Sequence, residues 1–191
     1  MATLQQVMDD QREFAIERDW GQFHTPKNLA MALGGEVGEL SNAIADALSS
    51  PGDKAGLASL ESVTSEIADV TLYLLRLFDV LGCSLPDRQV QRGQGTTASD
   101  SERLLFLALA KLVGAVGEIL EFWQWSAVGE DETSLERVER RITAAFDHLA
   151  RVAGLVGVGL ADVAEAKLTH NADRYPISKS FGVHSKYTEF D

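Results

Sequence analysis

Apolar side chains recur along most of the chain at the three-to-four-residue spacing of an amphipathic helix, and no segment shows the strict alternation typical of a half-buried strand. The segments that carry this helical spacing are residues 3–19, 27–48, 58–82, 102–127, 134–156 and 160–173. The pattern therefore predicts an all-α fold, built as a helical bundle. The tail from residue 177 onward has no such period and is predicted to be extended.

Turn-forming residues separate the predicted helices. The segment DWGQFHTPKN (19–28) is an irregular connection, in which Thr25 can cap the next helix and Pro26 occupies its first turn. Gly82 and Pro86 end the helix before them, because glycine accepts the left-handed conformation of a helix end and proline cannot continue the helix.

Two predicted helices each carry a pair of carboxylates three residues apart, Glu36 with Glu39 and Glu66 with Asp69. Residues at this spacing share one helix face. One such pair alone is more often a solvated face, but two pairs on neighbouring helices favour a shared site. Acids turned toward a bundle interior repel one another unless a cation neutralises them. An oxygen-only ligand set suits Mg²⁺ or Mn²⁺, so we expect a divalent metal site.

The composition and net charge of the chain limit the classes of molecule that it is expected to bind. The net charge of −12 argues against nucleic acid or an anionic membrane as a partner, although a bound metal would still admit a nucleotide. Cys83 is the only cysteine, which excludes a disulfide framework. The sequence has no apolar run long enough to span a bilayer and no signal-peptide pattern at its start, so a cytoplasmic location is expected.

An internal repeat relates the two halves of the chain. The polar, glycine-containing stretch 88–101 is predicted to be a linker between an N-terminal unit, 1–87, and a C-terminal unit, 102–191. LGGEVGEL at 33–40 aligns with LVGAVGEI at 112–119. In this alignment, the positions that correspond to Glu36, Glu39, Glu66 and Asp69 are Ala115, Glu118, Arg141 and Ala144, in that order. The second unit is therefore expected to keep the scaffold and to lack the metal site.

The second half carries other candidate binding groups. Lys167, Asn171 and Arg174 share one helical face, where they form either a solvated basic stripe at a helix end or a clamp for anionic oxygens. Trp123 and Trp125 lie just beyond Glu118, and both core packing and stacking on a base are open to them.

Several motifs together resemble the all-α nucleoside triphosphate pyrophosphohydrolases of the MazG-like superfamily, and most closely their dCTP pyrophosphatase branch. These motifs are ERDWGQFHTPKNL (17–29), GEVGEL (35–40), EIADVTLYLL (66–75), KLTHNADRYP (167–176) and KYTEF (186–190). Members of this branch carry all the motifs once in a short chain and assemble as paired dimers. Here the motifs are divided between the halves, which implies a fused pseudo-dimer with one complete site per chain.

The resemblance implies hydrolysis of a (deoxy)nucleoside triphosphate, with dCTP or a modified dNTP as the expected substrate, to the monophosphate and pyrophosphate. Glu36, Glu39, Glu66 and Asp69 match the family's catalytic acids and would bind Mg²⁺, or Mn²⁺. Positions that match its substrate-binding residues are Trp20, His24, Asn28, Tyr73, Trp125, Lys167, Asn171, Arg174, Lys186 and Tyr187. The family's habit also implies a homodimer, equivalent to a pseudo-tetramer. The alternatives are a non-catalytic nucleotide-binding or interaction protein and a purely structural bundle.

Overall fold

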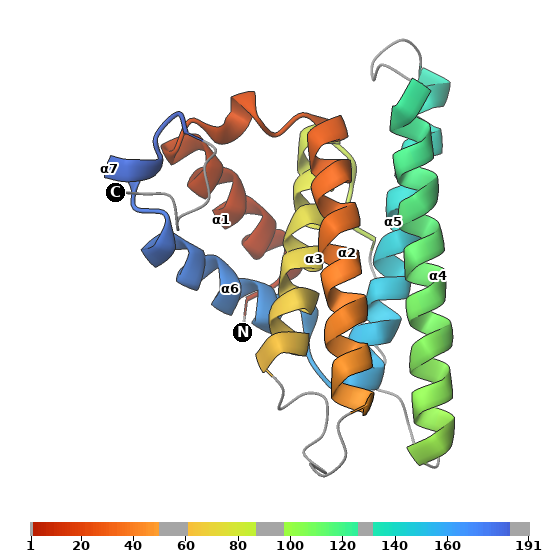
Figure 1. The fold of residues 1–191 in the computed structure, drawn as a ribbon. Helices are drawn as coiled ribbons and strands as arrows, with labels where there is room; N and C mark the ends of the chain where they lie inside the picture. The colour runs from red at the N-terminus through yellow and green to blue at the C-terminus, as the bar shows by residue number, and fades with distance from the viewer. Residues whose placement is uncertain (1, 50–60, 87–97, 126–131, 184–191) are drawn as a thin grey trace.

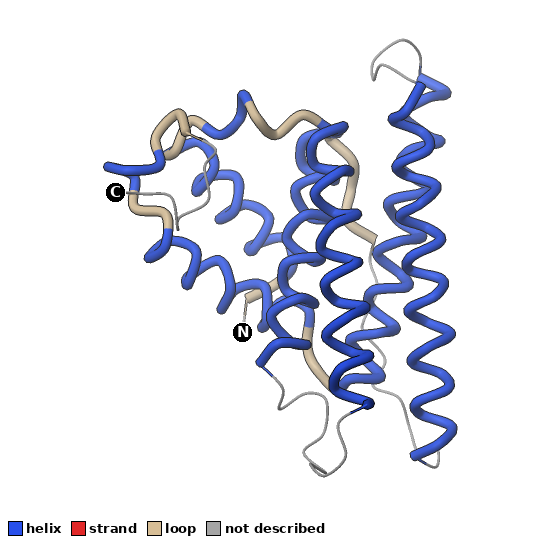
Figure 2. The backbone as a smooth tube through the Cα atoms, in the orientation of Figure 1, coloured by secondary structure: helices blue, strands red, loops and turns tan. Residues whose placement is uncertain are grey.

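The structure is a computed structural model that describes residues 2–49, 61–86, 98–125 and 132–183. Its elements are α1 (Leu4–Glu17), η1 (Trp20–Gln22), α2 (Pro26–Ser49), α3 (Glu61–Leu81), α4 (Ala98–Trp125), α5 (Glu132–Val156), α6 (Leu160–Arg174) and α7 (Ile177–Ser180). No strand occurs among the described residues (Figure 2). The all-α fold predicted from the sequence is confirmed.

Local sequence explains where several helices begin and end. Thr3 and Gln6 form a capping box on α1, with hydrogen bonds of 3.2 Å from the Gln6 N–H to the Thr3 hydroxyl and 2.7 Å from the Thr3 N–H to the Gln6 amide oxygen. The Thr25 hydroxyl accepts from the backbone N–H of Asn28 at 3.2 Å and caps α2, as predicted. Gly82 follows α3 with a φ of 66°, which a side-chain-bearing residue would adopt only with strain.

Helix α3 lies at the centre of the bundle. It packs against α2 and α5 on one side and against α1 and α6 on the other, so that the molecule has three layers of helices (Figure 1). Because α3 is covered from both sides, most of its side chains are buried, including the polar Thr71 and Arg76. The α2–α3 hairpin packs on the α4–α5 hairpin mainly through α2 and α4.

Two details of the predicted elements are wrong. The tail was expected to be extended, but residues 177–180 form the short helix α7. Its buried Ser180 donates a hydrogen bond to the backbone oxygen of Pro176 at 2.9 Å. The predicted linker 88–101 is helical from Ala98, where Asp100 in the first turn of α4 complements the helix dipole. Residues 88–97 lie outside the described part of the chain.

The last long helix crosses from the second half of the sequence to the first half of the structure. Helix α6 packs against α3 and α1 (Figure 1), which brings the C-terminal basic motif to the N-terminal acids. The division into repeat units 1–87 and 102–191, and their pseudo-dimeric relation, stay predictions. Among the described helices, none is both long enough and apolar enough to cross a membrane.

Candidate active site

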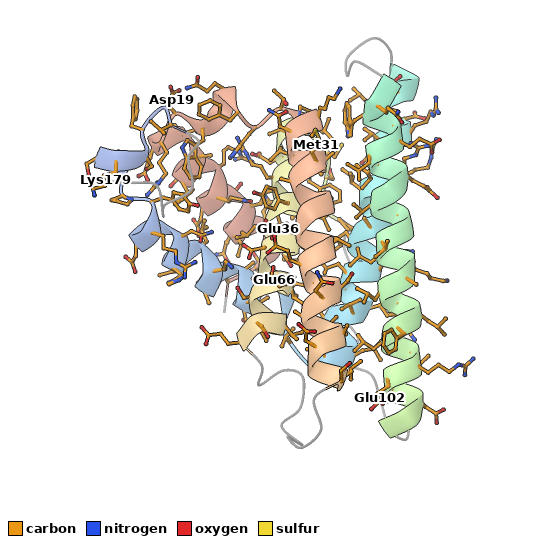
Figure 3. The ribbon with its side chains drawn as sticks, in the orientation of Figure 1. Asp19, Met31, Glu36, Glu66, Glu102 and Lys179 are labelled. Carbon is orange, nitrogen blue, oxygen red and sulfur yellow. The ribbon has the colours of Figure 1, made fainter. Side chains whose placement is uncertain are left out.

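The predicted acids of α2 and α3 form one cluster. Glu36, Glu39 and Glu66 each offer a carboxylate oxygen that lies within 4.8 Å of the other two. Glu36 and Glu66 are half-buried on the face of the α2–α3 pair that is turned toward α1 and α6 (Figure 3), whereas Glu39 is exposed. The described residues contain no second group of this kind. In α4, the repeat-related Ala115 is buried and Glu118 is exposed.

Asp69, the fourth predicted acid, is held by a cation of the protein itself. The ammonium of Lys167 on α6 forms an ion pair with the Asp69 carboxylate and donates to the hydroxyl of Ser65 at 2.7 Å. Lys167 and Asp69 are 98 residues apart in the sequence, and both side chains are largely buried. The packing of α6 on α3 therefore neutralises one acid of the cluster.

Burial and crowding raise the pKa values of Glu36, Glu66 and Asp69. The pKa of Glu36 rises to about 7, first because burial removes water from its carboxylate and then because Asp69, Glu39 and Glu66 repel its charge. Burial followed by repulsion from Asp69 also raises the pKa of Glu66. The pKa of Asp69 is raised by burial even though Lys167 opposes the rise. The fold thus gathers negative charge in a place where solvent compensates it poorly.

This donor set fits a divalent cation. One oxygen of Glu66, Oε2, is buried and has no hydrogen-bond partner among the described residues. An unpaired buried carboxylate oxygen is costly unless a cation or a donor satisfies it. All the donors are carboxylate oxygens, which hard cations such as Mg²⁺ and Mn²⁺ prefer. Glu36, Glu39 and Glu66 are therefore suited to hold such an ion, with Asp69 beside them.

The cluster lines one part of a cavity of about 610 Å³ between α1, η1, α2, α3 and α6. Predicted substrate-binding residues that also line it are Trp20, His24, Tyr73, Lys167, Asn171 and Arg174. Burial, followed by repulsion from Glu36, raises the pKa of Tyr73 to about 12, so its hydroxyl keeps its proton at neutral pH and can donate a hydrogen bond. The volume is within the range of small-molecule sites.

Aromatic side chains form the other part of the cavity wall. The Trp20 ring makes edge-to-face contacts with Phe14 at 5.5 Å, His24 at 6.1 Å and Tyr175 at 5.2 Å between ring centroids. Its indole N–H donates to the backbone oxygens of Ser180 at 3.0 Å and Val183 at 2.9 Å. The short helix α7 thus fixes the orientation of Trp20.

Some predicted residues do not meet in this cavity. The Asn28 side chain is exposed, is absent from the cavity wall, and donates to the backbone oxygen of Phe23 at 3.1 Å, so its observed contact supports the turn before α2. The side chain of Trp125 and the whole of Lys186 and Tyr187 lie outside the described part of the structure. The neighbouring Trp123 is buried and packs edge-to-face on Phe122 at 4.9 Å.

Sequence reasoning missed several residues of the cavity wall, among them Gln11, Phe14, Ser65, Arg76 and Tyr175. A signal existed for Arg76, because it lies on the same face of α3 as Asp69 and Tyr73 and is the one basic residue of an otherwise apolar helical run. No comparable signal existed for Gln11 and Phe14, which reach the cavity only through the packing of α1 on α3.

Comparison with curated proteins finds dCTP pyrophosphatases. Rat dCTP pyrophosphatase 1 (Rattus norvegicus) is 43% identical over 79 residues, which cover 39% of this chain and 45% of the rat protein. The mouse protein (Mus musculus) is 37% identical over 92 residues, covering 47% and 54%, and the human protein (Homo sapiens) is 40% identical over 77 residues, covering 39% and 45%. The chain thus spans about half the length of the curated relatives it matches. No family model and no solved structure matches it.

The helical fold and its acidic cluster agree with the MazG-like class of all-α proteins predicted from the motifs. Within that class, the curated matches are to dCTP pyrophosphatases, so the predicted resemblance to that branch is confirmed. The tandem-repeat form of the resemblance stays a prediction.

Proposed function

We propose that this protein hydrolyses a nucleoside triphosphate to the monophosphate and pyrophosphate, with the help of a divalent cation held by the acids of α2 and α3. The observation that carries the proposal is the composition of one cavity wall. Clustered carboxylates, the basic residues Lys167 and Arg174, and an aromatic group around Trp20 all line it. A nucleotide has matching parts: a metal-binding anionic chain, and a base with apolar faces.

The residues assigned to the cation are Glu36, Glu39, Glu66 and Asp69. A bound Mg²⁺ would neutralise charge on the phosphates and lower the pKa of a water molecule. Lys167 pairs with Asp69, and its ammonium lies at the edge of the acidic cluster. We expect Lys167 and Arg174 to contact phosphate oxygens when the triphosphate binds, because both line the cavity and carry positive charge.

The proposed reaction balances as a simple hydrolysis. The oxygen of water forms a bond with the α-phosphorus, the bond from that phosphorus to the bridging oxygen breaks, and pyrophosphate leaves with the electron pair. One glutamate of the cluster that is not fully engaged by the cation takes the proton of the attacking water. The cavity positions the phosphate chain, and the cationic side chains stabilise the charge that develops on it.

The preferred substrate is proposed from the relatives, whose names specify dCTP. We propose a deoxycytidine triphosphate or a base-modified form of it. The test is pyrophosphate release from canonical and 5-modified dNTPs, with Mg²⁺, with Mn²⁺ and with a chelator. Release that requires the metal supports the proposal. Nucleotide binding without release in any combination would instead favour the non-catalytic alternative.

We further propose that two copies of the chain associate. Phe106, Leu107 and Val113 of α4 are 51%, 50% and 48% exposed, on a face that neither α2 nor α5 covers. Gly114 and Gly117 lie on the exposed side of the same helix and allow a second helix to approach closely. An isologous dimer would cover this apolar stripe on both copies at once. The cytoplasmic location predicted from the sequence stays a prediction.

A further inference from the structure

A row of charged side chains, Arg12, Asp79 and Arg76, ends on His24, and both Arg76 and His24 line the cavity. Arg76 is only 7% exposed, and its Nε donates to Nδ1 of His24 at 3.0 Å while its Nη1 forms an ion pair with Asp79. Asp79 also accepts from Nε of Arg12 at 2.6 Å. The Asp79 side chain is 7% exposed, so its charge is shared between the two arginines and hardly at all with solvent.

This contact determines which nitrogen of His24 carries the proton. A guanidinium has only donors, so the Nδ1 atom facing it must be an acceptor without a hydrogen. The ring is then neutral, with its proton on Nε2. The surroundings act in the same direction: burial, and then the positive charge of Arg76, lower the pKa of His24 to about 4. His24 is therefore a fixed hydrogen-bond donor at neutral pH.

The donor is available to a ligand. His24 lines the cavity beside Trp20, and among the described residues its Nε2 atom has no hydrogen-bond partner. The acidic cluster and Lys167 belong to a different part of the wall, on α2, α3 and α6. A site for phosphate would gain from a positively charged imidazole, but this imidazole is held neutral beside a buried arginine. The arrangement suits an uncharged acceptor.

We propose that Arg76 and Asp79 are positioning residues that hold His24 as a neutral Nε2–H donor, directed at a hydrogen-bond acceptor on the nucleoside part of the substrate. The nature of the acceptor rests on the proposed function, whereas the tautomer of His24 rests on the contact with Arg76 alone. In this arrangement Asp79 orients the guanidinium, the guanidinium selects the tautomer, and the tautomer selects acceptors over donors on the ligand.

The first arm of the test is a nitrogen NMR measurement on the full chain without ligand. Long-range ¹H–¹⁵N correlation of the imidazoles should show His24 as a single neutral tautomer, protonated on Nε2, at neutral pH. In Arg76→Met we expect both tautomers, because the fixed donor is gone. Arg140→Met is the matched control, since that side chain is 69% exposed on α5, which contributes no described residue to the cavity wall, and it should leave the His24 signals unchanged.

Two results of this arm would overturn the proposal. One is a wild-type His24 that is protonated on Nδ1 or on both nitrogens at neutral pH. The other is a folded Arg76→Met variant whose His24 signals match those of the wild type. If Arg76→Met does not fold, the wild-type spectrum still determines the tautomer. Asp79→Asn, which keeps Arg76 but weakens its ion pair, then takes the place of Arg76→Met in the comparison.

The second arm measures binding of α,β-imido-dCTP with Mg²⁺ by calorimetry. Arg76→Met should weaken binding about two- to threefold, because the ligand then binds only the fraction of molecules whose imidazole carries its proton on Nε2, and Arg140→Met should not weaken it. In a His24→Gln background, where no tautomer exists to select, Arg76→Met should add little further loss. Equal losses in both backgrounds would refute action through His24. The expected tautomer in a protein that binds no nucleotide would refute the proposed function and uphold the positioning role.

Discussion

Replacing Glu36 with glutamine should make the metal-free protein more stable at pH 8 and leave its stability at pH 5 nearly unchanged. The pKa of Glu36 is raised from 4.5 to about 7 in the folded state, so folding favours the protonated acid. As pH rises from about 4.5 to 7, the unfolded chain releases this proton more readily than the folded one. The wild type therefore loses stability over that interval, and the neutral glutamine does not.

The size of this effect follows from the pKa shift. A rise from 4.5 to about 7 corresponds to at most about 3 kcal/mol, at about 1.4 kcal/mol per pH unit. Glu36 is only half-buried, and screening by solvent reduces the expected effect to about 1–2 kcal/mol. For a chain of 191 residues this is a rise in melting temperature of roughly 2–8 °C. A stability gain at a functional position is the usual sign of a site optimised for binding.

The assay is thermal unfolding, followed by circular dichroism in chelator at pH 5 and pH 8, with and without added Mg²⁺. Glu118→Gln is the matched control, because it makes the same change on the exposed surface of α4, at the repeat-related position of Glu39. We expect Mg²⁺ to raise the melting temperatures of the wild type and of Glu118→Gln by more than it raises that of Glu36→Gln. A Glu36→Gln variant that gains no more stability at pH 8 than at pH 5 would refute the account of the charge cluster.

Three other predictions follow from the same geometry. Glu39→Gln and Asp69→Asn should each abolish metal-dependent pyrophosphate release while retaining the fold. The control Glu118→Gln should keep nearly full turnover. Unchanged turnover in Glu39→Gln and Asp69→Asn would contradict the assignment of the acids. The pKa of His24 is lowered to about 4, so as pH falls from 6.5 the imidazole is protonated in the unfolded chain before it is protonated in the folded one. The free energy of unfolding of the wild type should therefore fall by about 2–3 kcal/mol by pH 4. Chemical denaturation of His24→Gln should show a smaller fall, and an equal fall would be evidence against a buried neutral His24. Val113→Glu should convert a dimer to a monomer in light scattering without changing the helical content, and a monomeric wild type would exclude the proposed interface.

The helices and the acidic cluster were predictable because they depend on local sequence. The spacing of apolar residues gave every long helix to within a few residues, and Thr25 and Gly82 marked their ends by well-known backbone preferences. The two carboxylate pairs could be placed near each other because the helices that carry them are adjacent in the sequence and joined by a short break. The resemblance to dCTP pyrophosphatases then supplied the chemistry that we propose for this cluster.

Contacts between distant segments were not predictable. The ion pair of Lys167 with Asp69 depends on α6 leaving the second half to pack on α3, which periodicity does not specify. The short helix α7 forms where its buried Ser180 and the Trp20 indole meet, a tertiary contact that overrides the weak local pattern. For the same reason the role of Arg76 emerged only when His24 was found beside it.

The most direct measurement of the central claim is the position of the solvent oxygen in the products. Wild-type protein is incubated with dCTP and Mg²⁺ in ¹⁸O-enriched water, and the phosphorus spectrum is followed. Attack at the α-phosphorus predicts dCMP that carries the label and unlabelled pyrophosphate, with neither product formed by Asp69→Asn. Labelled pyrophosphate, release of inorganic phosphate alone, or equal turnover by Asp69→Asn would contradict the claim that the acids of α2 and α3 form a pyrophosphohydrolase site.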